Sequence, residues 1–189
     1  FKEPGNLVYI VGLTRDELGG SHYALVNGLT GGQVPKVAPQ AARRTFAALH
    51  QAIARGLVRA CHDLSEGGLA VAAAEMSLAG RRGARLELED VPHELDLSAV
   101  GHADPQSGST ALGADLVTVL LFSESNTRLL CEVRPADAPA FEQLLAGVPA
   151  ACIGQVTDAP LFEICYRRRP LIQASVDELK TAWQSPLDW

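Results

Sequence analysis

Runs of apolar residues, separated by segments rich in glycine and proline, divide the chain into short elements. Continuous aliphatic and β-branched runs are typical of buried strands. They predict strands at residues 7–11, 116–122 and 129–133. Shorter or alternating runs predict further strands at 57–61, 85–89, 151–156 and 161–166, with the last two forming a pair joined through residues 157–160.

Four other segments have features of helices. Pro39 begins a helix that ends at Gly56, and its apolar residues recur every three or four positions on one face: Ala42, Phe46, Leu49 and Ile53. An alanine-rich segment predicts a second helix at 69–79, and residues 135–145 predict a third. Ser175 and Glu178 form a capping-box pattern that starts the last helix, which runs through Trp183.

Together these elements predict an α+β fold, a mixed β-sheet with helices packed on it, in a single domain over residues 1–189. Strict alternation of strand and helix fails near 85–133 and 151–166, which argues against a doubly wound parallel sheet. Residues 91–114 are polar and contain glycine and proline, so they predict a long loop within the domain.

Composition excludes two classes of protein. Sixteen basic against 22 acidic residues give a net charge of −6, and the densest basic run, three arginines at 167–169, is typical of a solvated turn, so nucleic acid is not an expected partner. The longest apolar run has seven residues, far short of a membrane span.

Four cysteines without a C-x-x-C spacing indicate thiols in a reducing, cytoplasmic compartment. The chain begins at Phe1, which suggests a fragment of a longer polypeptide.

The segment at residues 62–69 lies between a predicted strand and a predicted helix. Free amides and the helix dipole at such a position favour an anion, and Gly67 and Gly68 would let a phosphate approach the backbone. Three oxygen-bearing side chains could hold Mg²⁺ or accept from hydroxyls: Asp63, Ser65 and Glu66. The alternative is that Ser65 caps the helix and the glycines only permit close packing.

Two further loops carry polar candidates. Gly19, Gly20 and Ser21 follow the first strand without the spacing of a P-loop, and a plain turn is the alternative. Residues 123–128 could bind ribose hydroxyls or phosphate through Ser123, Glu124, Ser125 and Asn126, with Arg128 as a phosphate ligand. The alternative here is a turn in which Arg128 pairs with Glu124. We expect the three loops to meet at a common rim, where main-chain amides would bind an oxyanion.

Taken in order, residues 16–21, 62–70 and 121–126 with Arg128 resemble the phosphoribosylformylglycinamidine synthase family, and residues 179–183 resemble the close of its synthetase part. The resemblance covers residues 5–183. It implies a fold like the C-terminal domain of aminoimidazole ribonucleotide synthase, and identifies the chain with the C-terminal domain of the second half of a tandem duplication. The family is an ATP- and glutamine-dependent ligase that converts formylglycinamide ribonucleotide to formylglycinamidine ribonucleotide in purine biosynthesis.

The resemblance also implies cofactors and partners. The full enzyme would use ATP and Mg²⁺, and its partners would be the N-terminal domains of the same polypeptide, a glutaminase subunit or domain and the ribonucleotide substrate. Asp63 and Glu124, Ser125 and Asn126 match positions that in the first half hold Mg²⁺ and touch substrate. The second half lines a structural nucleotide site, so no catalytic residue is assigned here and the piece alone should be inactive. Alternatives are a domain of another ATP-using enzyme of the superfamily, or a non-catalytic assembly module.

Overall fold

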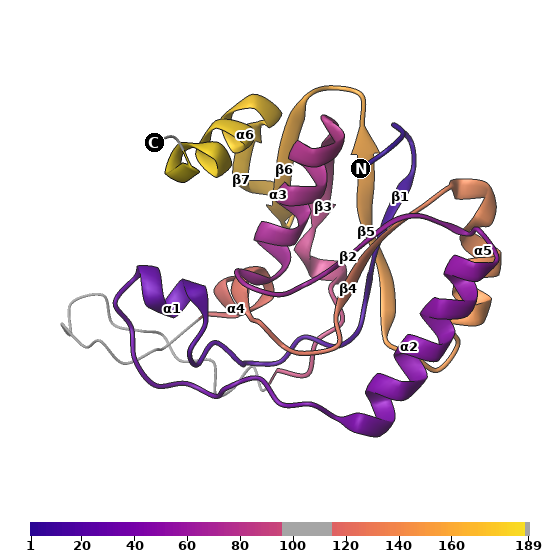
Figure 1. The fold of residues 1–189 in the computed structure, drawn as a ribbon, viewed down its shortest axis with the longest axis horizontal. Coiled ribbons are helices and arrows are strands. Elements are labelled where there is room, and N and C mark those ends of the chain that lie inside the picture. Colours follow the sequence, from indigo (N-terminus) through magenta and orange to yellow (C-terminus); the bar gives the residue numbers. More distant parts are fainter. Residues whose placement is uncertain (96–114, 188–189) are drawn as a thin grey trace.

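A seven-stranded sheet forms the centre of the computed structural model, which describes residues 1–95 and 115–187 (Figure 1). The strand order is β2-β4-β1-β5-β3-β6-β7, and all neighbours are antiparallel except β3 and β6. The strands are β1 (Leu7–Val11), β2 (Val58–Asp63), β3 (Gly83–Glu87), β4 (Leu129–Val133), β5 (Ala150–Thr157), β6 (Leu161–Tyr166) and β7 (Arg169–Ser175). The predicted α+β class and mixed sheet are confirmed.

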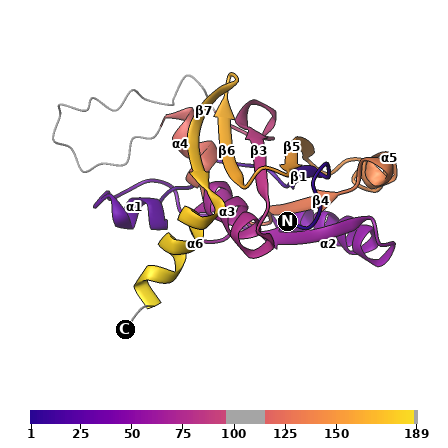
Figure 2. The same ribbon diagram turned by 90° about the horizontal axis from the view of Figure 1, so that it is seen from above.

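Helices cover both faces of this sheet. The described residues form α1 (His22–Val26), α2 (Pro39–Ala54), α3 (Gly68–Gly80), α4 (Leu116–Phe122), α5 (Ala138–Leu144) and α6 (Val176–Gln184). In Figure 1, α2 and α5 lie together, apart from α3. Figure 2 shows α6 running beside α3 from the end of β7, after the predicted capping box of Ser175 and Glu178.

Successive side chains of β1 point to opposite faces of the sheet and contribute to two separate parts of the core. Val8 and Ile10 pack in one cluster with the alanine-rich α3, whose small side chains let the helix lie close to the sheet. Tyr9 and Val11 point to the other face and pack with α2 and α5, where the rings of Tyr9 and Phe141 meet edge to face at 5.0 Å. The first strand is therefore buried on both sides, as its continuous apolar sequence indicates.

The strand predicted at 116–122 is wrong, because these residues form α4. Asp115 caps the helix by accepting a hydrogen bond from the Thr118 amide at 2.7 Å, and α4 packs against α3. A short, continuous apolar run does not distinguish a buried strand from a buried helix, since neither shows an amphipathic period when all sides are covered.

The predicted pairing of residues 151–156 with 161–166 is also wrong, because β3 inserts between β5 and β6. β6 pairs instead with β7, which the sequence analysis missed. Arg167 and Arg168, with φ of 51° and 61°, form the two-residue turn of this hairpin. Both arginines are exposed, so the predicted solvated turn at this basic run is confirmed.

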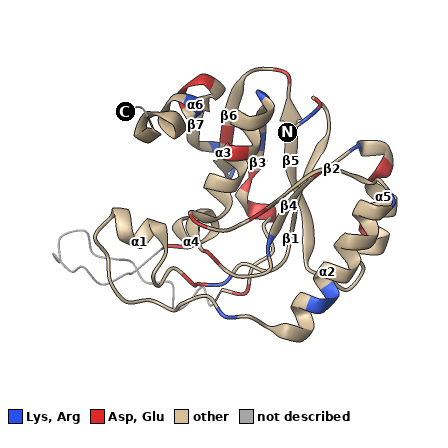
Figure 3. Cartoon of the chain, viewed as in Figure 1, with Lys and Arg blue, Asp and Glu red and all other residues tan. Residues whose placement is uncertain are grey.

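The apolar face of α2 is rotated from the predicted one. Ala42, Thr45, Leu49 and Ala52 are buried, whereas Phe46 and Ile53 are 52% and 48% exposed. From residue 96 on, the predicted loop at 91–114 lies outside the described residues. Within residues 1–95 and 115–187, none of the helices combines the length and apolar character that a membrane span requires. Figure 3 shows the basic residues scattered along the described elements.

Candidate functional site

The three predicted loops meet at one edge of the sheet, and Glu124 is the group that joins them. This residue lies between α4 and β4, and its Oε1 accepts a hydrogen bond from the Gly67 amide at 2.8 Å. The same oxygen accepts from the His22 amide, the first residue of α1, also at 2.8 Å. The three loops therefore converge at a common rim, as expected, and the oxygen that the main-chain amides bind there is a side-chain carboxylate of the protein.

The anion at this rim belongs to the protein itself. The Gly67 amide is taken by Glu124, and the Gly68 amide donates to the Ser65 carbonyl at 3.1 Å. These amides do not face an open cleft, so the expectation that they would bind a ligand phosphate is wrong. A carboxylate near the amino end of α3 satisfies the same unpaired donor and the same helix dipole that a phosphate would. The alternative in which the Ser65 side chain caps α3 is also wrong, since its hydroxyl donates to Asp63.

Ser123 and Ser125 are fully buried and bind the backbone of Arg15. The Ser123 hydroxyl donates to the Arg15 carbonyl at 2.7 Å, and the Arg15 amide donates to Ser125 Oγ at 3.0 Å. The two hydroxyl oxygens lie 3.0 Å apart. These hydroxyls hold the loop before β4 against the loop after β1, and their burial leaves neither of them facing a ribose.

Arg128 is a buried bridge between the same two loops and is only 1% exposed. Its guanidinium donates to the Ser125 carbonyl at 3.1 Å, to Thr14 Oγ1 at 3.0 Å, and to the Ser123 carbonyl. Burial lowers the pKa of Arg128 to about 10, although nearby Glu17 and Glu124 act in the opposite direction. Three donors are thus committed within the protein, and no ion pair joins Arg128 to Glu124 in the described chain.

Gly19, Gly20 and Ser21 shape the loop that leads into α1. The Gly19 amide donates to the Gln33 carbonyl at 2.8 Å, and Ser21 caps α1 by accepting from the Ala24 amide at 3.2 Å. None of the three lines the cavity described next. The Ser21 cap is local, whereas the Gly19 hydrogen bond ties this loop to the segment at Gln33, fourteen residues along the chain.

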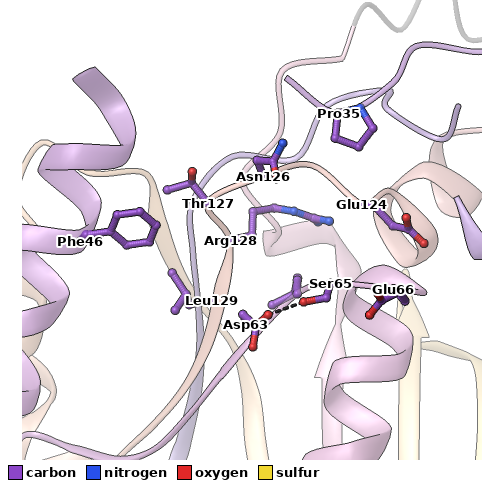
Figure 4. Close-up of a pocket in the computed structure, with 11 residues that line it drawn as sticks. Pro35, Phe46, Asp63, Ser65, Glu66, Glu124, Asn126, Thr127, Arg128 and Leu129 are labelled. Carbon is purple, nitrogen blue, oxygen red and sulfur yellow. Dashed lines mark hydrogen bonds between the residues drawn. The ribbon is translucent and has the colours of Figure 1, made fainter. Parts of the chain in front are cut away.

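Beside the Glu124 carboxylate lies an open cavity of about 420 Å³ (Figure 4). Of the candidates named from the sequence, it is lined by Asp63, Ser65, Glu66, Glu124, Asn126 and Arg128. Asp63 ends β2 and is 70% exposed at its side chain. The hydroxyl of Ser65 donates to Asp63 and holds the pKa of that carboxyl below its ordinary value, with a smaller effect from His62.

The sequence analysis missed the other residues that line the cavity, which are Pro35, Phe46, Leu64, Thr127 and Leu129. Figure 4 shows the ring of Phe46 on α2 across the cavity from Glu124 and Glu66. Phe46 belongs to the apolar face that the sequence predicts for α2, and such a pattern does not distinguish a packed side chain from one that lines a cavity. The exposed Phe46 ring adds an aromatic surface to a cavity that is also lined by Asp63, Glu66 and Glu124.

The cavity has an acidic lining. Asp63, Glu66 and Glu124 face a single guanidinium, that of Arg128. Within residues 1–95 and 115–187, no three His, Cys, Asp or Glu side chains are grouped to hold a metal ion by themselves. Asp63 is nevertheless an accessible carboxylate, and Mg²⁺ commonly takes one or two protein carboxylates and completes its shell with water and phosphate oxygens.

Replacing Glu124 tests its role as the internal anion. We expect Glu124→Ala to lower the free energy of unfolding by about 2 kcal/mol, because the half-buried Gly67 amide loses its acceptor. Glu124→Gln keeps an acceptor oxygen and should cost about half as much. Urea denaturation measures both, with exposed Glu89→Ala as the control, expected within about 0.5 kcal/mol of the unchanged chain. Equal stability of all three variants would show that the hydrogen bonds to Glu124 contribute nothing.

Comparison with known proteins identifies the family of this chain. Residues 3–166 match the family described as AIR synthase related protein, C-terminal domain. The chain belongs to this family. Over its whole length, this AIR synthase related domain is 35% identical to "Phosphoribosylformylglycinamidine synthase subunit PurL" of Synechococcus elongatus, and over 99% of its length it is 37% identical to that of Leifsonia xyli. It spans 23% and 22% of these relatives, about a quarter of their length.

Solved structures of larger proteins contain the same fold. The PurL of Thermotoga maritima complexed with FGAR has a TM-score of 0.73 at 22% identity, over 94% of this domain and 28% of that chain. The same protein complexed with ATP has a TM-score of 0.69 at 21% identity, over 95% and 26%. The hydrogenase maturation protein HypE in complex with ATP has a TM-score of 0.58 at 17% identity, over 92% and 52%.

Proposed function

We propose that this domain is the C-terminal domain of the second half of a phosphoribosylformylglycinamidine synthase. The observation that carries the proposal is the end-to-end match at 35% identity to one quarter of a curated PurL. The full enzyme would use ATP to activate the formyl amide oxygen of formylglycinamide ribonucleotide, and ammonia from glutamine would replace that oxygen to give the amidine. The N-terminal domains of the polypeptide and a glutaminase would be its partners, in the cytoplasm.

Within that enzyme, we propose that the cavity forms one wall of a nucleotide site. Solved PurL complexes of Thermotoga maritima with ATP, ADP and AMPPCP support a nucleotide as the ligand class. A volume of about 420 Å³ is in the range of small-molecule sites. Phe46 offers an apolar surface for a base, while Asn126 and Ser65 offer polar contacts for ribose or phosphate.

The acidic lining bears on the form in which the nucleotide binds. Three carboxylates and one guanidinium repel a free polyphosphate, and the amides that would compensate are already occupied by Glu124. A bound Mg²⁺ would supply positive charge against the phosphates. Asp63, an exposed carboxylate at the end of β2, is the residue that would hold this ion.

Nucleotide binding should therefore depend on the metal. We expect isothermal titration calorimetry to show Mg²⁺·ADP binding to the 189-residue chain at least tenfold more tightly than ADP in EDTA. Asp63→Asn should remove most of this difference, because it removes the charged ligand. Asp158→Asn, which changes an exposed carboxylate that pairs with Arg82, is the matched control. Equally tight binding of ADP in EDTA would contradict the role given to Asp63.

The activity itself is tested by replacing the matching quarter of Synechococcus elongatus PurL with this chain. We expect the chimera to form the amidine from formylglycinamide ribonucleotide, ATP and glutamine with its glutaminase, and the 189-residue chain alone to show no turnover. The equivalent domain of HypE is the control insert. If that insert supports turnover as well as this chain does, the proposal is too narrow and the domain is a generic module of the superfamily. A folded but inactive chimera would favour an unrelated assembly role.

A further inference from the structure

Two cysteines that are far apart in the sequence face each other across neighbouring strands. Cys61 of β2 and Cys131 of β4 are register partners in the antiparallel ladder, and their sulfur atoms lie 3.7 Å apart. Directly opposed residues in such ladders have Cα atoms about 4.5–5.5 Å apart. That spacing falls inside the range of about 4.4–6.8 Å found in disulfides. The two thiols are therefore placed for a bond that needs side-chain motion rather than strand movement.

The two thiols have different surroundings. Cys61 lies on an edge strand and is exposed, whereas Cys131 is fully buried between β2 and β1, beside Tyr9. An oxidant in solution therefore reaches the exposed Cys61 sulfur first, and the Cys131 thiol lies next to it on the neighbouring strand.

We propose that Cys61 and Cys131 are an oxidisable pair that closes into a reversible disulfide on reaction with a hydroperoxide. The Cys61 thiolate attacks the peroxide, the O–O bond breaks, and Cys61 becomes a sulfenic acid while the departing hydroxide takes up a proton to form water. The Cys131 sulfur then attacks the Cys61 sulfur, the S–O bond breaks, and a second water leaves with the Cys131 proton. The two thiols give up two electrons, which reduce one hydrogen peroxide to two waters.

The position of the pair connects this chemistry to the cavity. Cys61 is two residues before Asp63, and Cys131 lies three residues after Arg128, so the bond would join neighbouring strands whose ends both contribute residues to the cavity lining. The inference rests on the strand register, the sulfur distance and the difference in exposure of the two thiols, and it does not depend on the proposed function.

Peptide mapping of the 189-residue chain after hydrogen peroxide tests the proposal. We expect a monomer lighter by two hydrogens, a linked peptide pair containing Cys61 and Cys131, and full reversal by dithiothreitol. Cys131→Ala should leave Cys61 as a sulfenic acid that dimedone traps. Cys61→Ser, a change at an exposed position, should lower the yield of intramolecular disulfide at least tenfold. Cys152→Ser, at another exposed cysteine, is the matched control and should behave as the unchanged chain.

Three results would overturn the proposal. One is a dimedone adduct on Cys61 of the unchanged chain with Cys131 still a free thiol. Another is an oxidised product that consists of disulfide-linked dimers. The third is oxidation of Cys152 before Cys61. All three are read from the unchanged chain, so they hold even if Cys131→Ala fails to fold.

Discussion

Arg128→Ala should lower the free energy of unfolding by about 4 kcal/mol or more, the largest effect of any single change that we predict. The substitution removes the shared donor of the Ser123 and Ser125 carbonyls and of Thr14 Oγ1. It also leaves Glu17 and Glu124 without the buried positive charge between them. Urea denaturation of the variant, read as a shift in the midpoint, measures the loss.

The matched control for this experiment is Arg43→Ala, which removes an exposed arginine from α2 and should change stability by less than about 0.5 kcal/mol. Arg128→Lys should recover little, because an ammonium group does not reach three acceptors in the plane of a guanidinium. A stable Arg128→Ala variant that loses only ligand binding would restore Arg128 as the phosphate ligand first predicted from the sequence.

Gly68→Ala should cost about 3–4 kcal/mol. Gly68 has a φ of +62°, which strains any residue with a Cβ, and that atom would lie 2.4 Å from the Ser123 carbonyl oxygen. The atoms that the new Cβ would meet belong to the backbone of residues 121–123. The steric overlap is therefore relieved only if this backbone moves away from the start of α3. Thermal and urea unfolding measure the cost.

Gly20→Ala separates strain from crowding. Gly20 has a φ of +74°, but an added Cβ meets nothing within 4 Å, so only the conformational cost of about 1–2 kcal/mol should appear. If the two alanine variants are equally stable, the close crossing of the two loops at Gly68 does not matter to the fold.

The sequence predicted where the site lies better than what occupies it. Each of the three loops follows a recognisable element and carries glycine or small polar residues, so their convergence could be expected. The partner of the Gly67 amide could not be predicted from the sequence. Glu124 lies 57 positions away and reaches this amide through the packing of α4 against α3. The burial of Ser123, Ser125 and Arg128 could not be predicted either. The polar character of a side chain does not reveal whether it faces a ligand or a neighbouring loop.

Errors in the fold came from local patterns that tertiary contacts decide. Residues 116–122 are apolar apart from Thr118, and each is buried or half-buried in α4, so no hydrophobic period distinguished helix from strand. The pairing of β3 with β6 is parallel and long-range, so no tight turn in the sequence predicts it. The facing of Cys61 and Cys131 likewise depends on the register of β2 and β4 across 70 residues.

The central claim is that Glu124 permanently fills the amide site and that ligands bind in the cavity beside it. Amide chemical shifts and hydrogen exchange, followed by NMR while Mg²⁺·ADP is added, test this directly. The account predicts shifts at Asp63, Ser65 and Asn126, with the Gly67 amide remaining protected and nearly unshifted. A large shift at Gly67 that matches the one caused by Glu124→Gln would mean that phosphate displaces the carboxylate, and would contradict the claim.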